Sequence, residues 1–214
     1  MTIITNLLKL VLIVVLPFVI LVRGSVYIHQ YHELGAYPSL LVGLAASTIL
    51  LFVYMTIVYA KLTSSLGDGD NLQRRLLFAF LLVLGYSLYG LYFMSPDNFK
   101  KPELRKEMND LHPILRLGVS TFILLDRDMI ITDATRVPED YRSMGLTTPR
   151  GSLHYTQQDG YAYAMDLRTS DRHELRNTFM TMYFRLLGFR TLRHTGTADH
   201  LHVSLHCHYR PRAR

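Results

Sequence analysis

Hydrophobic residues gather in three long runs in the first part of the chain. The runs cover residues 3–22, 40–60 and 76–94, and each has about the 20 residues that a helix needs to cross a bilayer. Polar and charged residues separate the runs. We therefore predict a membrane domain of three transmembrane helices in residues 1–94, followed by a second domain in residues 95–214.

The first run has an alternative interpretation as a cleaved signal peptide. Lys9 precedes a short apolar stretch from Leu10 to Val22, which is the order of charge and hydrophobicity in such a peptide. The stretch ends at Arg23 and Gly24, however, without a cleavage site of small residues. A membrane helix is therefore the favoured interpretation.

Charges in the loops give nearly balanced evidence on membrane orientation. Lys61, Arg74 and Arg75 in the second loop, together with Lys9, favour an inside amino terminus and an outside C-terminal half. The opposite orientation is favoured by Arg23, Lys100, Lys101, Arg105 and Lys106. We expect the C-terminal half outside, mainly because the chemistry considered below has its substrate there.

The pattern changes after residue 94. A polar linker leads into a helix from about Pro102. Residues 111–126 predict either a helix that starts at Pro113 or a strand near residues 120–125, and residues 129–132 predict a strand. An irregular stretch follows as far as residue 152.

A helix of period 3.6 is predicted after this stretch. Asp171 and Glu174 have the spacing of a capping box, and Gly188 marks the end of the helix. One apolar face is expected to contain Leu175, Phe179, Met182 or Tyr183, and Leu186.

The last part of the chain alternates with a period of two residues, which predicts a half-buried strand. One face would hold His200, His202, Ser204, His206 and His208, and the other Leu201, Val203, Leu205 and Cys207. We expect His206 and His208 to lie on a solvated strand face, although metal binding is possible for both. Cys207 is expected to be a small core residue.

The net charge of +6 changes this picture little. The excess is scattered, and the basic tail at Arg210, Arg212 and Arg214 is short, so no nucleic-acid partner is expected. A surface that faces lipid headgroups or solvent explains the charge more simply.

Histidine and aspartate residues suggest metal chemistry in the second half. A catalytic zinc ion needs about three nitrogen or oxygen ligands and one open position. His154, Asp166 and the segment 199–202 supply imidazoles and carboxylates from three parts of the sequence. Taken alone, these residues are equally compatible with ordinary polar positions in loops and on a strand.

Five segments, in their order along the chain, resemble a known family. They are IITDATRVPEDYRSMG at 130–145, SLH at 152–154, AYAMDL at 162–167, a helix that ends in LLGF, and ADHLHV at 198–203. This order resembles that of the zinc D-Ala-D-Ala carboxypeptidases and L-Ala-D-Glu endopeptidases, relatives of the Hedgehog signalling domain. The resemblance covers about residues 111–204 and implies an α+β zinc peptidase domain, a small antiparallel sheet with flanking helices.

The resemblance also implies roles for individual residues. The Zn²⁺ ligands would be His154, Asp166 and His202, and Asp199 would be the general base that activates the metal-bound water. Arg136 would bind a carboxylate or carbonyl of the substrate. His200 would donate a hydrogen bond, either to a metal ligand or to the transition state. Ser152 would orient the loop that carries His154.

Two features depart from the family pattern, and one geometric requirement follows from it. Asp166 comes twelve positions after His154, which exceeds the family's usual spacing, so that Asp159 is a rival ligand. Asp133 and Ala134 replace a serine and a glycine. On a regular strand Asp199 and His202 face opposite sides, so Asp199 has to lie in a turn before the strand.

The sequence therefore predicts a membrane-anchored zinc metallopeptidase that cleaves peptidoglycan stem peptides, as a carboxypeptidase or an endopeptidase. Its partners would be peptidoglycan or its peptide precursors and the lipid bilayer. It would be an integral protein of a bacterial inner membrane, or phage-encoded, with the catalytic domain facing the periplasm or exterior. Two alternatives are a non-catalytic, zinc-stabilised peptidoglycan-binding module and a membrane-assembly or transport component with a structural tail.

Overall fold

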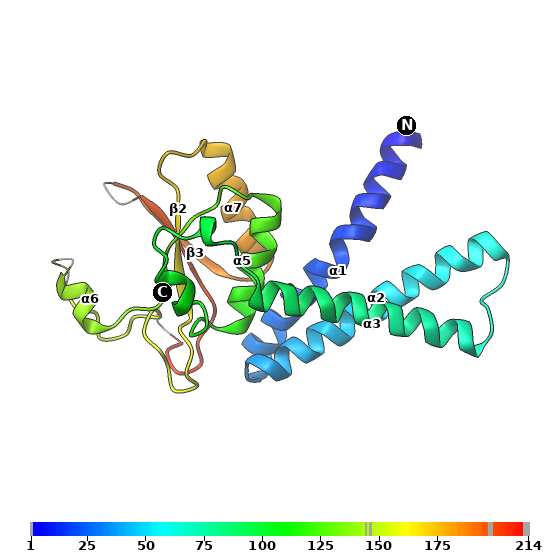
Figure 1. The fold of residues 1–214 in the computed structure, drawn as a ribbon, viewed down its shortest axis with the longest axis horizontal. Helices are drawn as coiled ribbons and strands as arrows, with labels where there is room; N and C mark the ends of the chain where they lie inside the picture. Colours follow the sequence, from blue (N-terminus) through cyan, green and yellow to red (C-terminus); the bar gives the residue numbers. More distant parts are fainter. Residues whose placement is uncertain (1, 144, 146, 197–198, 212–214) are drawn as a thin grey trace.

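The computed structural model describes residues 2–143, 145, 147–196 and 199–211, with the backbone alone for residues 2–14. Three long helices precede a small sheet with flanking helices, so the chain is an α+β protein (Figure 1). Its elements are α1 (Thr2–His32), α2 (Ala36–Thr63), α3 (Gly69–Tyr92), η1 (Pro96–Asn98), α4 (Leu104–Glu107), α5 (Pro113–Leu125), β1 (Ile131–Asp133), α6 (Pro138–Ser143), β2 (Ala164–Arg168), α7 (Glu174–Leu186), β3 (Arg190–His194) and β4 (His200–Ser204).

Two helices, not the predicted three, are long and apolar enough to cross a membrane among the described side chains. They are α2 and α3, which form an antiparallel hairpin that projects from the rest of the molecule (Figure 1). Both are longer than predicted, because the runs at 40–60 and 76–94 capture only their most apolar parts. Their length and composition favour a membrane protein.

The third predicted span, residues 3–22, belongs to α1, and residues 3–14 lie outside the described side chains. The helix continues well beyond the predicted end, to His32. Leu21, Val22 and Val26 in its second half are buried within the protein. This half of α1 is therefore part of the protein core. The apolar run at 3–22 predicted the start of the helix but not its end at His32.

The sheet has four antiparallel strands in the order β1-β2-β4-β3. Its central pair, β2 and β4, aligns Asp166 with His202 and Leu167 with Leu201. Because side chains alternate along a strand, the two polar residues share one face and the two leucines share the other. The sheet is thus divided into a polar face and an apolar face.

The apolar face of the sheet belongs to the hydrophobic core. Met165 and Val203 join Leu115 and Leu117 of α5 and Phe184 of α7 in one buried cluster. The same cluster includes residues of α1, α2 and α3, so the long helices and the sheet share their core. Residues 113–125, where the sequence is compatible with both a helix and a strand, form the buried helix α5.

The predicted linker after residue 94 is attached to the rest of the fold. The side chain of Asn98 donates hydrogen bonds to the carbonyls of Arg127 and Met129, at 2.9 and 2.8 Å. The backbone N–H of Lys100 donates to the carbonyl of Ile131. The segment therefore runs along the edge of the sheet beside β1.

Helix α7 is where predicted, but it is turned the other way. Of the predicted apolar face, Leu175, Phe179, Met182 and Leu186 are all exposed. Tyr183, the alternative to Met182, is partly buried against the core. Asn177, Met180 and Phe184 are buried instead. The sequence pattern identified an apolar stripe correctly, but it did not reveal which face meets the core.

The ends of α7 agree in part with the prediction. The N-terminal cap is His173, whose Nδ1 accepts from the backbone N–H of Leu175, and not Asp171. Asp171 has a positive φ of 60° in the preceding turn. Gly188 ends the helix with a φ of +94°, a conformation that favours glycine.

The predicted final strand stops at Ser204, so His206 and His208 do not extend its polar face. Nε2 of His29 in α1 lies 3.1 Å from the carbonyl of His206, and Nε2 of His208 lies 2.6 Å from the carbonyl of His29. These two residues therefore anchor α1 to the end of the chain. Cys207 is buried, as predicted.

We expect Gly43→Ala to destabilise the protein. Gly43 of α2 lies against α1, and a Cβ there would come within 2.5 Å of the carbonyl oxygen of Leu21. Such overpacking costs about 1–3 kcal/mol. Thermal unfolding in detergent should show a lower midpoint for this variant.

Gly85→Ala is the matched control, because a Cβ at Gly85 in α3 meets nothing within 4 Å. Alanine is also the better helix former. Equal unfolding midpoints for the two variants would contradict the close contact between α1 and α2.

Candidate metal centre

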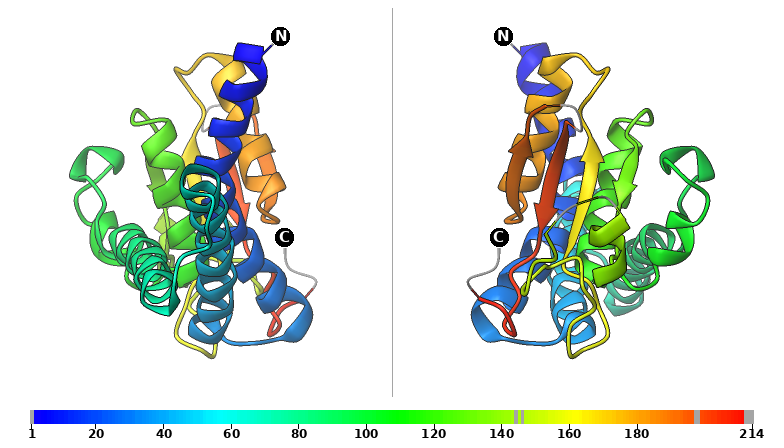
Figure 2. Two further views of the ribbon diagram at one scale, coloured as in Figure 1. Left: turned by 90° about the vertical axis from the view of Figure 1, so that its right-hand side faces the viewer. Right: turned by 90° about the vertical axis from the view of Figure 1, so that its left-hand side faces the viewer.

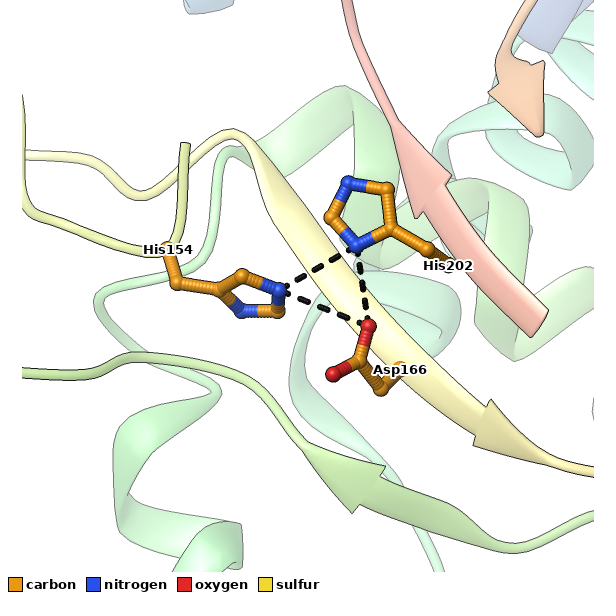
Figure 3. A group of neighbouring side chains, drawn as sticks. All are labelled: His154, Asp166 and His202. Atoms are coloured by element: carbon orange, nitrogen blue, oxygen red, sulfur yellow. Dashed lines mark hydrogen bonds and ion pairs between the residues drawn. The ribbon is translucent and has the colours of Figure 1, made fainter. Parts of the chain in front are cut away.

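Three side chains from separate parts of the sequence meet above the polar face of the sheet. Asp166 is in the middle of β2, and His202 is its direct partner on β4. His154 comes from the loop before β2, where its backbone carbonyl accepts from the N–H of Arg136. All three side chains are buried and point toward one another (Figure 3).

The three inward atoms form a nearly regular triangle. Nε2 of His154 lies 3.2 Å from Nδ1 of His202 and 3.4 Å from Oδ1 of Asp166, and the last two atoms are 2.9 Å apart. Ligands of a tetrahedral zinc ion at about 2.0–2.1 Å lie about 3.3 Å from one another. The group could therefore hold a metal ion of that size.

Hydrogen bonds among the three residues cannot satisfy all three inward atoms at once. Nδ1 of His154 lies 2.7 Å from the carbonyl of Ala134, and a hydrogen on Nδ1 leaves a lone pair on Nε2. One hydrogen on Nδ1 of His202 cannot point at both His154 and Asp166. A cation that receives all three lone pairs removes the conflict, and the bond to Ala134 is the outer contact typical of a metal-bound histidine.

The surroundings keep the Asp166 carboxylate charged. Burial alone raises its pKa, but the close imidazoles of His154 and His202 hold the pKa of Asp166 well below its ordinary value. The second carboxylate oxygen accepts from Nη2 of Arg136 at 2.7 Å. One oxygen thus faces the two imidazoles while the arginine fixes the other.

Arg136 is placed as a partner of the metal group. Its guanidinium also donates from Nε to Asp133 at 2.8 Å and from Nη1 to Tyr141 at 3.3 Å. Asp133 therefore supplies a second countercharge. The predicted contact of Arg136 with a substrate carboxylate stays a prediction.

Ser152 has contacts that suit the orienting role expected for it. Its hydroxyl accepts from the backbone N–H of His154 at 3.2 Å and lies 2.7 Å from the hydroxyl of Tyr141. Because Tyr141 also contacts Arg136, one chain of contacts links the histidine loop to the arginine.

The structure separates the two remaining predicted residues. His200 is on the polar face, with Nε2 3.7 Å from Oδ2 of Asp166. Asp199 accepts from Thr169 at 2.7 Å and from two nitrogens of Arg193, each at 2.8 Å. The hydrogen bonds from Arg193 lower the pKa of Asp199 to about 2, outweighing the effect of burial.

These contacts do not bring Asp199 to the metal group. It precedes β4 directly, and its partner Arg193 also bonds Glu174 of α7, on the apolar side of the sheet. A base role for Asp199 stays a prediction, and it requires the carboxylate to leave Arg193.

The rival ligand Asp159 lies outside the group. Its carboxylate accepts from the hydroxyl of Tyr163 at 2.7 Å and from the N–H of Tyr161 at 3.3 Å. The extra residues between His154 and Asp166 form a turn closed by the hydrogen bond from Gly160 N–H to the carbonyl of Gln157. The long spacing is thereby absorbed before β2 begins.

The sequence did not point to two neighbours of the site. The ring of His194 on β3 stacks on that of His200, with centroids 4.7 Å apart. Tyr141 of α6 joins Arg136 and Ser152. The alternation in residues 190–194 could have placed His194 beside β4, whereas no signal in the sequence reveals Tyr141.

Comparisons with known proteins give no family for this chain. A scan of protein-family models, a search of curated proteins and a search of solved structures each found no match. The geometry of the residues themselves is therefore the basis for a functional proposal.

Proposed function

We propose that the protein is a membrane-anchored, zinc-dependent peptidase whose metal is held by His154, Asp166 and His202. The convergence of their three inward atoms within 3.4 Å of one another is the observation that carries the proposal. Two imidazoles and one carboxylate are a common ligand set of catalytic zinc, in which a water takes the fourth position.

Zinc bound here would lower the pKa of a bound water to about 7 and polarise the carbonyl under attack. The protein's own residues have supporting roles. Arg136 and the carbonyl of Ala134 orient two of the ligands from outside. His200, partly exposed beside Asp166, is the titratable group best placed to exchange a proton with a substrate on the polar face.

The substrate class comes from the resemblance and from the membrane helices. Peptidoglycan stem peptides, or their lipid-linked precursors, lie outside a bacterial inner membrane, where a peptidase attached to α2 and α3 would reach them. We therefore propose that the sheet faces the periplasm or exterior. The nearly balanced loop charges leave this orientation to a protease-protection assay.

A metal-stabilised binding module is the second candidate. It is favoured by the ion pairs of two charged residues to which the resemblance gives catalytic roles. Arg136 is paired with Asp133 and Asp166, and Asp199 with Arg193. Neither charge needs a substrate to be balanced.

One experiment on the full-length protein separates these possibilities. The protein, purified in detergent, should contain about one zinc per chain. It should also release amino acids or shorter peptides from isolated stem peptides, and a chelator should stop the release. Bound zinc without cleavage would support the binding module, and absence of bound metal would refute both candidates.

A further inference from the structure

The outer face of α7 carries an exposed apolar stripe. Leu175, Phe179, Met182 and Leu186 are 73%, 51%, 55% and 72% exposed. Their spacing of four, three and four residues places them on one side of the helix. Large apolar side chains arranged in this way on a soluble surface are unusual and mark a contact with something apolar.

Apolar surface is also exposed on the neighbouring helices. Leu124 and Leu125, at the end of α5, are both exposed. An apolar groove of about 210 Å³ extends from there to the first and third helices. Phe18 of α1 and Tyr86 of α3 line one part of it, and Tyr183 and Leu187 at the end of α7 line another.

Specific contacts fix this surface to a helix with the features of a membrane span. The hydroxyls of Tyr86 in α3 and Thr121 in α5 are 2.5 Å apart. The hydroxyl of Tyr183 in α7 donates to the carbonyl of Gly118 in α5 at 2.9 Å. Helix α7 is therefore held beside the third helix through α5.

The direction of α7 suits a helix that lies on a surface. Figure 1 shows α7 running across the direction of the α2–α3 hairpin. In the left view of Figure 2, seen from the hairpin side, α7 is again upright, and in the right view the sheet stands in front of the helices. If the hairpin crosses a bilayer, α7 lies along the plane of that bilayer.

We propose that α7 is an interfacial helix, whose outer stripe is inserted into the headgroup and acyl-chain boundary of the membrane that α2 and α3 cross. Its charged residues flank the stripe, and the side opposite the stripe, with Met180 and Phe184, is buried in the protein. Arg176 pairs with Asp126 and Asp128 after α5, and Glu174 pairs with Arg193 of β3. The outer side of α7 is therefore an apolar stripe bordered by paired charges, which suits a helix whose outer side lies in an interface.

Lipid is a better occupant than a second copy of the chain. Tyr183 and Leu187, the neighbours of Met182 and Leu186 in α7, line a groove that also includes Tyr86 of α3. The stripe therefore lies close to a helix that would be surrounded by acyl chains if it crosses a bilayer. The proposal rests on membrane insertion of α2 and α3, and it is independent of the metal and of peptidase activity.

A single tryptophan tests the proposal, because the chain has none. Phe179→Trp in the full-length protein, reconstituted into vesicles of phosphatidylcholine with brominated acyl chains, should lose most of its emission. Val137→Trp is the matched control, since Val137 is 53% exposed and adjoins α6, far from the hairpin (Figure 1). Its emission should stay nearly unchanged.

The outcomes distinguish lipid from other occupants. Emission from the Phe179→Trp variant that is unquenched and typical of water would overturn the proposal. Unquenched emission that becomes blue-shifted only at high protein-to-lipid ratio would indicate a second copy instead, and would overturn it too. If Phe179→Trp does not fold, Leu186→Trp gives the same test at a side chain that is 72% exposed.

Discussion

We expect His154→Ala, His202→Ala and Asp166→Asn each to abolish stoichiometric zinc binding by the full-length protein. Each change removes one of the three inward atoms, and two remaining ligands hold zinc far less tightly than three. In Asp166→Asn the guanidinium of Arg136 also loses its carboxylate partner at 2.7 Å. Metal analysis after dialysis, together with loss of peptide cleavage, measures the effect.

The control for Asp166→Asn is the same replacement at Asp159. Its carboxylate accepts from Tyr163 and has no place in the group, so zinc content should be unchanged. Loss of zinc in Asp159→Asn but not in Asp166→Asn would mean that the turn before β2 holds the metal. Full occupancy in either histidine variant would refute the ligand set.

The second large effect is expected at His200. His200→Ala should reduce peptide cleavage by about 10²–10⁴-fold, the usual contribution of a group that transfers a proton, while zinc stays bound. The reason is its position on the polar face, 3.7 Å from Asp166. Cleavage rates across a range of pH, measured beside zinc content, separate a lost proton-transfer group from a lost metal.

Asp199→Ala is the companion variant. It breaks the bonds to Arg193 and Thr169, so its expected effect is a lower unfolding temperature with cleavage largely retained. The reverse result, full stability with cleavage lost, would support the general-base role implied by the resemblance. It would also mean that the carboxylate turns away from Arg193 during the reaction.

The strand that carries the metal site was the most predictable element. Alternation of histidine with leucine and valine from residue 200 fixed which side chains share a face, and it placed His202 opposite the apolar side. The same alternation continues through His206 and His208, although the strand stops at Ser204. His206 and His208 instead contact His29 of α1. A contact with a helix so distant in the sequence cannot be predicted from the local alternation of residues.

Helix α7 was less predictable than this strand, because its position could be predicted but its orientation could not. Its length and its final glycine could be predicted from period and conformation, but the direction of its apolar stripe could not. Hydrophobic periodicity locates a stripe without stating whether protein or another apolar medium covers it. The small buried set at Asn177, Met180 and Phe184 was sufficient for packing against α5 and β3.

The choice of Asp166 over Asp159 as the metal ligand depends on the register between strands β2 and β4. Both carboxylates are within chain reach of His154. The resemblance favoured Asp166, and the pairing of β2 with β4 is what places it beside His202. Asp166 aligns directly with His202, whereas Asp159 is used within its own turn. Strand register is a long-range property, which is difficult to read from one sequence.

The attachment of α5 to the hairpin has a consequence for where the protein acts. The hydroxyl of Ser120 in α5 donates to the carbonyl of Gly90 in α3, and Asn98 holds the segment after α3 to the sheet. The domain that contains the sheet is therefore fixed to the hairpin and is not joined to it by a flexible linker. With α3 in a bilayer, the metal group would stay at one height above the lipid. Material in that thin layer alone would be within reach, and new substrate would be met by sideways diffusion of the whole molecule.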